Sequence, residues 1–420
     1  MKILYVSQYF PPEMGAPAAR VSELAQHWAE DGHEVTVLTG FPNHPTGVLH
    51  PAYRHKWRRL VCDEEINGVR VVRSWLLPLP NRKPYERILN YSSFSLSAAA
   101  TGMFLPQPDV VIATSPQLLV GLAGYWLAAR KRVPFVFEVR DLWPESLMAV
   151  GLGSTNSLMN RALGAIADFL YARAQRVVVV SPAFRQHLKE HRQVDPAKIA
   201  VIENGVETGL FRPIASSTGL KQRLGIEGKF VVGYIGTIGM AHGLEMLITA
   251  ASELQLIAPE VVFLIVGEGA EKGKIRALAV NQGLNNIVFV DQQSRDQIPQ
   301  FISACDACLV LLRKTDLFQT VIPTKMLEFM SCSRPVLVAV DGQARTIVEQ
   351  ANAGVFVEPE NACALVDAIR RLQNNPEMRE YLGHNGRRHI LAHYSRRQTA
   401  TAYISLLETI LGRSRSRAVA

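Results

Sequence analysis

Short runs of β-branched and aliphatic residues alternate along the chain with longer segments in which apolar residues recur at helical spacing. This alternation is typical of parallel sheets covered by helices on both faces. In the first half the predicted strands are 3–7, 34–38, 69–73, 110–113, 135–139, 177–180 and 199–202. In the second half they are 230–235, 261–266, 287–290, 307–311 and 336–340. Because the pattern starts again half-way, we predict two doubly wound α/β domains.

A stretch without strand pattern separates the two series of strands. We predict an N-terminal domain over 1–204, a linker rich in Pro, Ser and Gly over 205–228, and a C-terminal domain over 229–395. The C-terminal helix, 396–412, is expected to pack back on the first domain. Two domains suit 420 residues, because single cores stop growing near ~250–300 residues. Ligands of such folds bind beyond the carboxyl ends of the strands, so we expect a cleft between the domains.

The formal net charge of +8 is spread over both halves and does not mark a nucleic-acid-binding domain. The five cysteines are an odd, sparse set, which favours a reduced, cytoplasmic compartment, and Cys305 and Cys308 are expected to be buried thiols. No apolar run reaches the ~18–20 residues of a membrane span, and the first residues do not resemble a signal peptide. We therefore expect a cytoplasmic protein whose membrane contact is peripheral, on the inner face of the plasma membrane.

The turn after the first predicted strand, 11–20, is rich in Pro, Gly and Ala and leads into an amphipathic helix. Small residues such as Gly15 let a phosphate approach the backbone, and the helix start supplies free N–H groups. The alternative is a plain proline-rich turn. Neither the dinucleotide pattern GxGxxG nor a GxxxxGK[ST] phosphate loop occurs, which argues against an NAD dehydrogenase.

A second motif lies at 323–336. Pro323 and Thr324 signal a helix start, with Thr324 as N-cap candidate. Lys325 and Glu328 are three residues apart, hence on one helix face about 4.5 Å apart along the axis. A lysine opposes the helix dipole unless an anion binds there. Lys325 would then bind the phosphates of a nucleoside diphosphate and Glu328 the ribose hydroxyls. The alternative is a surface salt bridge between the two, worth a few tenths of a kcal/mol.

These motifs, with 204–206, 236–244 and 266–269, resemble glycosyltransferase family 4 essentially from end to end. This family comprises retaining transferases with the two-domain GT-B fold. The nearest subgroup is the bacterial surface-polysaccharide transferases, including proteins similar to L-fucosamine transferases. The resemblance implies an α/β protein of GT-B type, with two doubly wound Rossmann-like domains facing across a cleft.

The resemblance also implies a donor site. In the family, the turn holding Gly15 faces the donor diphosphate, the glutamate at Glu328 binds the ribose, and the loop at Asp291 and Gln292 lies beside the base. The donor-binding candidates are Gly15, Arg20, Thr237, His242, Glu268, Asp291, Gln292, Thr324, Lys325 and Glu328.

The chain departs from the family pattern at several of these positions. Thr320 replaces the first of two glutamates seven residues apart, and Thr237 and His242 stand near the places of the phosphate-binding Arg and Lys. The cation has moved to Lys325. His242 would help bind phosphate only if protonated, and its ordinary pKa near ~6.5 leaves it mostly neutral at pH 7.

Arg140 stands after strand 135–139, where many relatives carry a His near the sugar. Arginine does not deprotonate, so Arg140 would orient or stabilise charge rather than act as a base. Asp141 and Glu145 are acceptor-side candidates, and Arg140, Asp141, Glu145 and Lys325 are the predicted catalytic residues. The alternative is an Arg–carboxylate pair that holds the loop in place.

The loop 41–45 resembles the subgroup's Asn-rich acceptor loop, so Asn43 and His44 are acceptor-side candidates; a rigid double-proline turn is the alternative. Residues 54–59 interleave cations with Trp57. An anionic lipid surface, nucleic acid or a solvated loop would each explain them, and a nucleic-acid partner lacks any recognised module.

We predict a retaining glycosyltransferase that moves a sugar from a nucleotide-diphospho-sugar to a glycan or polyprenyl-diphosphate-linked acceptor in bacterial surface-polysaccharide biosynthesis. UDP is favoured and GDP stays open. No Asp-x-Asp occurs, so neither a catalytic metal nor a cofactor is implied. The alternatives are a sugar-nucleotide epimerase of the same shape and a non-catalytic nucleotide-binding subunit of polysaccharide assembly.

Overall fold

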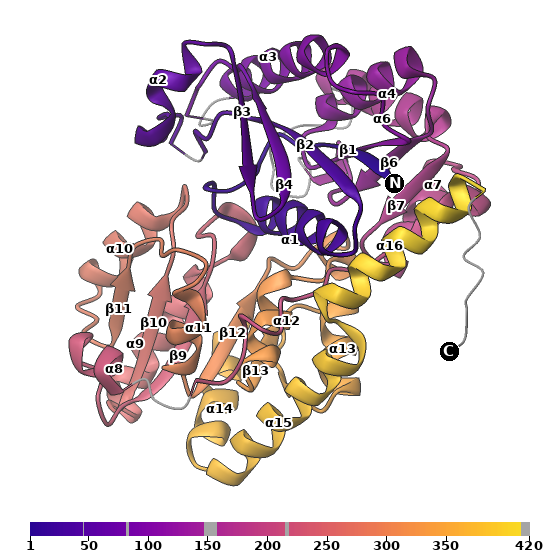
Figure 1. The fold of residues 1–420 in the computed structure, drawn as a ribbon. Helices are drawn as coiled ribbons and strands as arrows, with labels where there is room; N and C mark the ends of the chain where they lie inside the picture. Colours follow the sequence, from indigo (N-terminus) through magenta and orange to yellow (C-terminus); the bar gives the residue numbers. More distant parts are fainter. Residues whose placement is uncertain (45, 81–83, 147–157, 215–217, 413–420) are drawn as a thin grey trace. The chain divides into compact units, whose positions relative to one another are not determined.

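A computed structural model describes the chain except for residues 45, 81–83, 147–157, 215–217 and 413–420. The chain forms two compact units. Unit 1 comprises Met1–Asn204 together with the chain from Arg396 onward, and unit 2 comprises Gly205–Ser395. Each unit is a twisted sheet covered by helices on both faces (Figure 1).

The sheet of unit 1 has the strand order β3-β4-β2-β1-β5-β6-β7-β8. The strands are β1 (Lys2–Val6), β2 (Glu34–Gly40), β3 (Val61–Ile66), β4 (Val69–Ser74), β5 (Val110–Thr114), β6 (Phe135–Val139), β7 (Arg176–Val179) and β8 (Ile199–Val201). All neighbours are parallel except β3 and β4, which form a hairpin. The prediction missed β3 because half of this edge strand is acidic and none of its residues is fully buried.

Helices α3, α4 and α6 cover one face of this sheet, and α1 with α16 cover the other (Figure 1). The helices of unit 1 are α1 (Ala16–Glu30), η1 (Pro51–Tyr53), α2 (Arg54–Trp57), α3 (Pro84–Met103), α4 (Leu118–Lys131), α6 (Leu158–Arg173), α7 (Pro182–His191), η2 (Pro196–Lys198) and α16 (Arg396–Ile410). Trp28 of α1 donates its indole N–H to the carbonyl of Ala400, 3.1 Å away, and its ring contacts Tyr403. These contacts hold α16 in unit 1.

The sheet of unit 2 is parallel throughout, in the order β11-β10-β9-β12-β13-β14. Its strands are β9 (Phe230–Ile235), β10 (Val261–Val266), β11 (Ile287–Val290), β12 (Ala307–Leu311), β13 (Val336–Ala339) and β14 (Gly354–Phe356). The prediction missed β14, which has only three residues. The sequence turns from β10 and β11 back to β12 beside β9, so the order reverses between β9 and β12, where doubly wound folds bind ligands.

Two apolar clusters enclose this sheet. Side chains alternate along β9: Val231 and Ile235 point to one cluster, and Val232 and Tyr234 to the other. The helices of unit 2 are α8 (Thr218–Arg223), η3 (Met240–His242), α9 (Glu245–Ile257), α10 (Lys272–Asn281), α11 (Ile298–Ser303), η4 (Phe318–Thr320), α12 (Thr324–Ser331), α13 (Gln343–Gln350), α14 (Ala362–Gln373) and α15 (Pro376–His393).

The predicted linker, 205–228, is not a separate segment. Val206 and Phe211 are fully buried in the core of unit 2, and Leu220 and Ile226 pack beside them. The backbone N–H of Val206 donates to the carbonyl of Tyr394. The abundance of Pro, Ser and Gly predicted a linker, but the burial of these spaced apolar residues holds them in the core of unit 2.

The cysteines at 305 and 308 are free, buried thiols, as predicted. Among the described residues, no helix combines the length and the apolar character that crossing a bilayer requires.

Candidate active site

Helix α12 begins at Thr324, directly after Pro323, and this start fixes the positions of Lys325 and Glu328. Pro323 is the N-cap, with no side-chain hydrogen bond to the helix. The prediction of Thr324 as the cap was therefore wrong by one residue, because proline's fixed φ suits the extended cap conformation found here. Lys325 is consequently in the first turn, one turn before Glu328.

Lys325 lies against the backbone turn after β9. Its Nζ atom donates a hydrogen bond to Oη of Tyr234 at 3.0 Å and lies 4.2 Å from the centre of that ring. Gly236 has φ +141°, and a Cβ there would come within 3.0 Å of the lysine nitrogen. Burial lowers the pKa of Lys325 to about 7, against the opposing effect of the Glu328 carboxylate. The amine is therefore near its titration point at neutral pH.

His242 lies beside the same tyrosine but carries no charge. Its ring centre is 6.2 Å from that of Tyr234, and its Nδ1 atom is 3.3 Å from the carbonyl oxygen of Gly239. Burial, helped by the charge of Lys325, lowers the pKa of His242 to about 3. His242 is neutral at pH 7, so Lys325 provides the charge at this turn. Thr237, next in the turn, is exposed and accepts from Tyr234 through its carbonyl.

Glu328 forms an ion pair with Arg295, whose Nη1 atom is 3.0 Å from Oε1. The Arg295 guanidinium also lies 4.8 Å from the ring centre of Phe211. Arg295 follows β11, in a loop that the sequence had marked only through Asp291 and Gln292. A ribose diol would bind Glu328 in the presence of this arginine.

The loops after β9 and β10 run against each other. Gly267 and Gly269 have φ of +150° and +157°, and a Cβ on either would lie about 2 Å from a backbone carbonyl oxygen of the β9 loop. Glu268, between them, forms an ion pair with Lys272 of α10. Lys272 also contacts Asp291 at 2.6 Å. The sequence analysis missed Lys272, which joins two predicted donor-site carboxylates.

Of the unit 1 candidates, Gly15 is the N-cap of α1, with φ +125°. The first N–H groups of a helix have no partner within the helix, and the approach of a phosphate to this helix start stays a prediction. Ala16 and Pro17 begin the helix without an acidic residue in the first turn.

Arg20 is fully buried in unit 1, which corrects its donor-binding prediction. It forms a 2.9 Å ion pair with Glu138, itself fully buried. It also donates to the carbonyls of Ile202 and Glu203 and to Oδ1 of Asn204. Its N–H groups thus tie α1 to β6 and to the end of β8, and it has a structural role.

Arg140 and Asp141 follow β6, and their backbone N–H groups donate to the hydroxyl of Ser115 at 2.7 and 3.3 Å. Within the described residues, Nε and Nη1 of Arg140 are buried without a hydrogen-bond partner. Burial raises the pKa of Asp141 to about 6, although Arg140 opposes this. The guanidinium therefore keeps donors for a further group.

Glu145 is engaged elsewhere, which corrects its prediction as an acceptor-side residue. Its Oε1 atom accepts from Arg192 at 2.7 Å and lies 3.4 Å from Nε2 of His187. Burial alone would raise its pKa, but His187 and Arg192 outweigh burial and lower it to about 2. An Arg–carboxylate pair does hold this loop, and the arginine is Arg192 rather than Arg140.

Asn43 is buried in a polar cluster at the ends of β1 and β2. Its Oδ1 atom accepts from Asn90 of α3 at 3.3 Å, and its backbone N–H and that of His44 both donate to Oε1 of Glu13 at 2.9 Å. Burial raises the pKa of Glu13 to about 7. The ring of His44 lies against that of Tyr9, with centres 4.8 Å apart, and burial of the imidazole, with the charge of Arg87, lowers the pKa of His44 to about 4. Glu13 and Asn90 were not among the predicted site residues, although Glu13 lies within the first motif.

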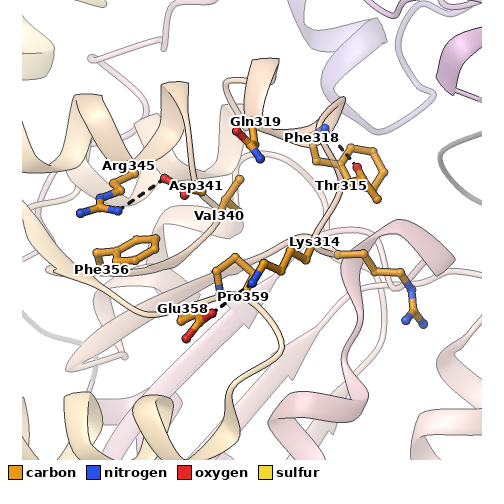
Figure 2. Close-up of a pocket in the computed structure, with 11 residues that line it drawn as sticks. Lys314, Thr315, Phe318, Gln319, Val340, Asp341, Arg345, Phe356, Glu358 and Pro359 are labelled. Atoms are coloured by element: carbon orange, nitrogen blue, oxygen red, sulfur yellow. Dashed lines mark hydrogen bonds and ion pairs between the residues drawn. The ribbon is translucent and has the colours of Figure 1, made fainter.

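A cavity of about 260 Å³ lies beyond β12, β13 and β14 of unit 2 (Figure 2). Its charged side chains are paired: Lys314 with Glu358 at 3.1 Å, and Arg345 with Asp341 at 3.6 Å. Arg345 also covers the ring of Phe356. Lys325 and Glu328 are not part of its lining.

Comparison with known families identifies both units. Residues 15–205 match the family described as "Glycosyl transferase 4-like domain", and residues 217–389 match "Glycosyl transferases group 1". The chain belongs to the family 4 glycosyltransferases. It is thus a retaining enzyme that uses a nucleotide sugar.

Two curated relatives align with this glycosyltransferase over nearly its full length. A putative colanic acid biosynthesis glycosyl transferase, WcaI of Escherichia coli K12, is 26% identical over 91% of this chain and 95% of its own length. A GDP-mannose-dependent α-mannosyltransferase of Mycolicibacterium smegmatis is 26% identical over 93% of both.

Solved structures share the fold of the glycosyltransferase. Sucrose-phosphate synthase from Thermosynechococcus elongatus aligns with a TM-score of 0.79 and 22% identity, over 98% of this chain and 99% of that one. Anabaena HepE in complex with UDP-glucose aligns with a TM-score of 0.73 and 19% identity, over 97% and 100%. The predicted GT-B fold, with two Rossmann-like domains, is confirmed.

In unit 2 of the glycosyltransferase, the predicted residues gather at the carboxyl edge of β9, β10 and β11 and at the start of α12. They are Thr237, His242, Glu268, Asp291, Gln292, Thr324, Lys325 and Glu328. Lys272 and Arg295 lie with these residues. The sequence analysis missed both, because charged pairs across loops depend on the fold and leave no local pattern in the sequence.

Proposed function

We propose that the enzyme transfers a sugar from a UDP-sugar to a hydroxyl of a glycan or polyprenyl-diphosphate-linked acceptor, in bacterial surface-polysaccharide biosynthesis such as that of O-antigen or capsule. The transferred group is a hexosyl or N-acetylaminodeoxyhexosyl residue, as in the L-fucosamine transferase-like subgroup. The colanic acid relative supports the polysaccharide role, and the UDP-glucose complex of the Anabaena protein supports the donor class. The mannosyltransferase relative is the reason to test GDP as well.

The observation that carries this proposal is Lys325 at the start of α12, against the Gly236 turn. When the bond between the anomeric carbon and the β-phosphate oxygen breaks, negative charge grows on the leaving diphosphate. Lys325 and the free N–H groups of the first turn of α12 would stabilise that charge. The proposal assigns this task to the chain's own groups and routes no step through a metal or cofactor.

Donor recognition follows from the neighbouring loops of unit 2. Glu328 would accept from the ribose hydroxyls while its ion pair with Arg295 holds the carboxylate in position. Asp291 and Gln292 after β11 would lie beside the base, with Lys272 holding Asp291 and Glu268 in place. Thr237 and Thr324 would contact the phosphates from the two sides of the lysine.

Unit 1 would supply the acceptor side. The Gly15 turn would approach the diphosphate, and the unpartnered donors of Arg140, beside Asp141, would orient the donor sugar. Asn43 and His44 would contact the acceptor from the loop that Glu13 holds in place. This proposal makes 1–204 with the last helix the acceptor domain and 229–395 the donor domain.

The decisive experiment is sugar transfer by Lys325→Ala. Removal of one preorganised donor to a developing oxyanion costs roughly a hundredfold to a thousandfold in turnover. We expect a loss of about a hundredfold with unchanged thermal unfolding. The matched control is Lys314→Ala, which removes an exposed lysine paired with Glu358 in the same unit and should leave turnover intact. If Lys325→Ala has the turnover of the wild type, Lys325 does not bind the phosphates.

Glu328→Ala tests the ribose assignment separately, because it should weaken binding of UDP by calorimetry while leaving protein folding intact. Unchanged affinity would exclude Glu328 from the nucleotide. Product analysis with and without an acceptor distinguishes transfer from isomerisation of the UDP-sugar, as an epimerase would need no acceptor.

We place the enzyme in the cytoplasm, peripheral on the inner face of the plasma membrane, because a polyprenyl-linked acceptor lies there. The cations of residues 54–59 favour an anionic membrane surface. Nucleic acid is not among the proposed partners.

A further inference from the structure

Helix α3 exposes an apolar side. Ile88, Leu89, Leu96 and Met103 are 48%, 49%, 74% and 44% exposed. They recur at helical spacing along one face, and we call them the α3 stripe. The opposite face of the helix packs on unit 1, where Asn90, Phe94 and Ala98 are fully buried. Because an outward helix face is normally polar, a stripe of this length indicates a contact surface.

Three exposed cations belong to the same unit as this helix. Arg54, Arg58 and Arg59 are exposed in and after α2. A direct chain of contacts links them to α3: Trp57 stacks on Trp75, with ring centres 6.0 Å apart. The segment after Trp75 is bonded to α3, since the N–H of Leu77 donates to Oγ of Ser93 at 2.9 Å. The basic and the apolar residues therefore belong to one region of unit 1.

Trp57 itself has an internal role. Its indole N–H donates to the carbonyl of Leu76 at 3.0 Å, and its ring lies on Trp75. The aromatic that the sequence placed among the cations thus connects α2 to the strand extension. The apolar contribution to the surface comes from α3, about thirty residues later, which no local pattern at 54–59 reveals.

We propose that the α3 stripe and the cations Arg54, Arg58 and Arg59 dock unit 1 on an anionic lipid leaflet. Aliphatic side chains partition into the interface between headgroups and acyl chains, and arginines bind the anionic headgroups beside them. A second copy is the poorer occupant, since a two-fold interface built on this region would bring the same cations of both copies together. This docking surface rests on the membrane partner of the proposed function and assigns residues to it.

The docking surface lies close to the acceptor loop. Asn90, on the buried face of α3, donates to Oδ1 of Asn43 at 3.3 Å. The thickness of one helix, about 10–12 Å, therefore separates the acceptor loop from the side that carries the stripe. A sugar on a lipid-linked acceptor would reach Asn43 without leaving the membrane surface.

The test is flotation with vesicles of phosphatidylcholine alone or mixed with phosphatidylglycerol, without nucleotide. Wild-type protein should bind the mixed vesicles, and more weakly at high salt. Leu89→Ser with Leu96→Ser should weaken this binding roughly a hundredfold, about tenfold for each side chain. Arg58→Gln with Arg59→Gln should weaken it about twenty-five-fold, about fivefold for each charge.

The matched control is Leu256→Ser with Val280→Ser, which removes two side chains of unit 2 that are 82% and 71% exposed. It should bind vesicles like the wild type. If Leu89→Ser with Leu96→Ser binds vesicles as tightly as the wild type, the docking surface is overturned. It is also overturned if sedimentation velocity shows that the wild type is a dimer and that this variant is a monomer. Sugar transfer to a soluble acceptor is measured in parallel. If the wild-type protein transfers no sugar, the proposed function is contradicted, whereas the vesicle result bears only on the docking surface.

Discussion

The Nζ atom of Lys325 donates a hydrogen bond to Oη of Tyr234, 3.0 Å away. The tyrosine hydroxyl in turn donates to the carbonyl of Thr237 at 2.6 Å, so its proton is engaged and its lone pair faces the lysine. The contact holds the amine in place in either protonation state, because a neutral amine also donates. An anion bound at this turn would therefore change the protonation state of the Lys325 amine and not its position.

Donor binding should be coupled to proton uptake. The pKa of Lys325 is about 7 in the free protein, and a bound diphosphate would raise it, because an anion favours the charged amine. At pH 8 the free amine is mostly neutral and takes up a proton on binding, whereas at pH 6 it is already charged. Calorimetry with a UDP-sugar should show an enthalpy that depends on the buffer's ionisation enthalpy at pH 8 only. Lys325→Met should abolish this dependence; its persistence would assign the proton elsewhere.

Gly236→Ala should lower the affinity for UDP, whereas Gly228→Ala should not. The new Cβ would come 3.0 Å from the lysine nitrogen at a φ of +141°, which displaces the amine. Gly228→Ala is the control: Gly228 has φ +71° with no atom within 4 Å of a built Cβ, so it tests backbone strain alone. Strain of this kind costs of order 1–3 kcal/mol in either variant. Equal UDP affinity in the two variants would contradict the contact.

Arg20→Met should destabilise unit 1 by about 3–5 kcal/mol, because it leaves Glu138 buried without its counter-charge. In the wild type, burial would raise the pKa of Glu138, but the charges of Arg20 and Arg140 outweigh burial and lower it. The contribution of the ion pair therefore persists above the unfolded pKa and is lost as pH falls through the folded one. The deficit of the variant should therefore be largest at neutral pH and shrink in acid. Thermal unfolding at several pH values measures it. A loss of UDP affinity with unchanged stability would restore the donor-binding role.

Glu13→Gln should flatten the pH dependence of stability. Burial raises the pKa of Glu13 from 4.5 to about 7, so the folded state holds a proton that the unfolded state releases. Wild-type stability should fall as pH rises from about 4.5 to about 7, and the variant should lack this component. The amide oxygen can still accept from the N–H groups of Asn43 and His44. Unfolding midpoints at pH 5 and pH 8 make the comparison, and parallel changes in both proteins would exclude a protonated Glu13.

The strands were predictable where the sequence has a continuous apolar run. The fully buried β9, β10 and β12 have the predicted bounds, and so does the partly buried edge strand β11, because parallel strands under helices are continuous apolar runs. β3 and β14 were missed, since a polar edge strand and a three-residue strand leave little pattern. The segment 205–228 shows the opposite error, in which turn residues hid the buried Val206 and Phe211.

The sequence by itself predicted two α/β units and the position of Lys325 and Glu328 on one helix face, because these depend on local periodicity and spacing, and its motifs resemble those of the family. Only the tertiary structure decided which charges are paired and which are not. Arg20 and Glu145 have structural roles because they pair with Glu138 and Arg192, while Lys272 pairs with Asp291 and Arg295 with Glu328. The physical reason is that burial and counter-charges set the state of an ionisable group, and both come from residues far away in the chain.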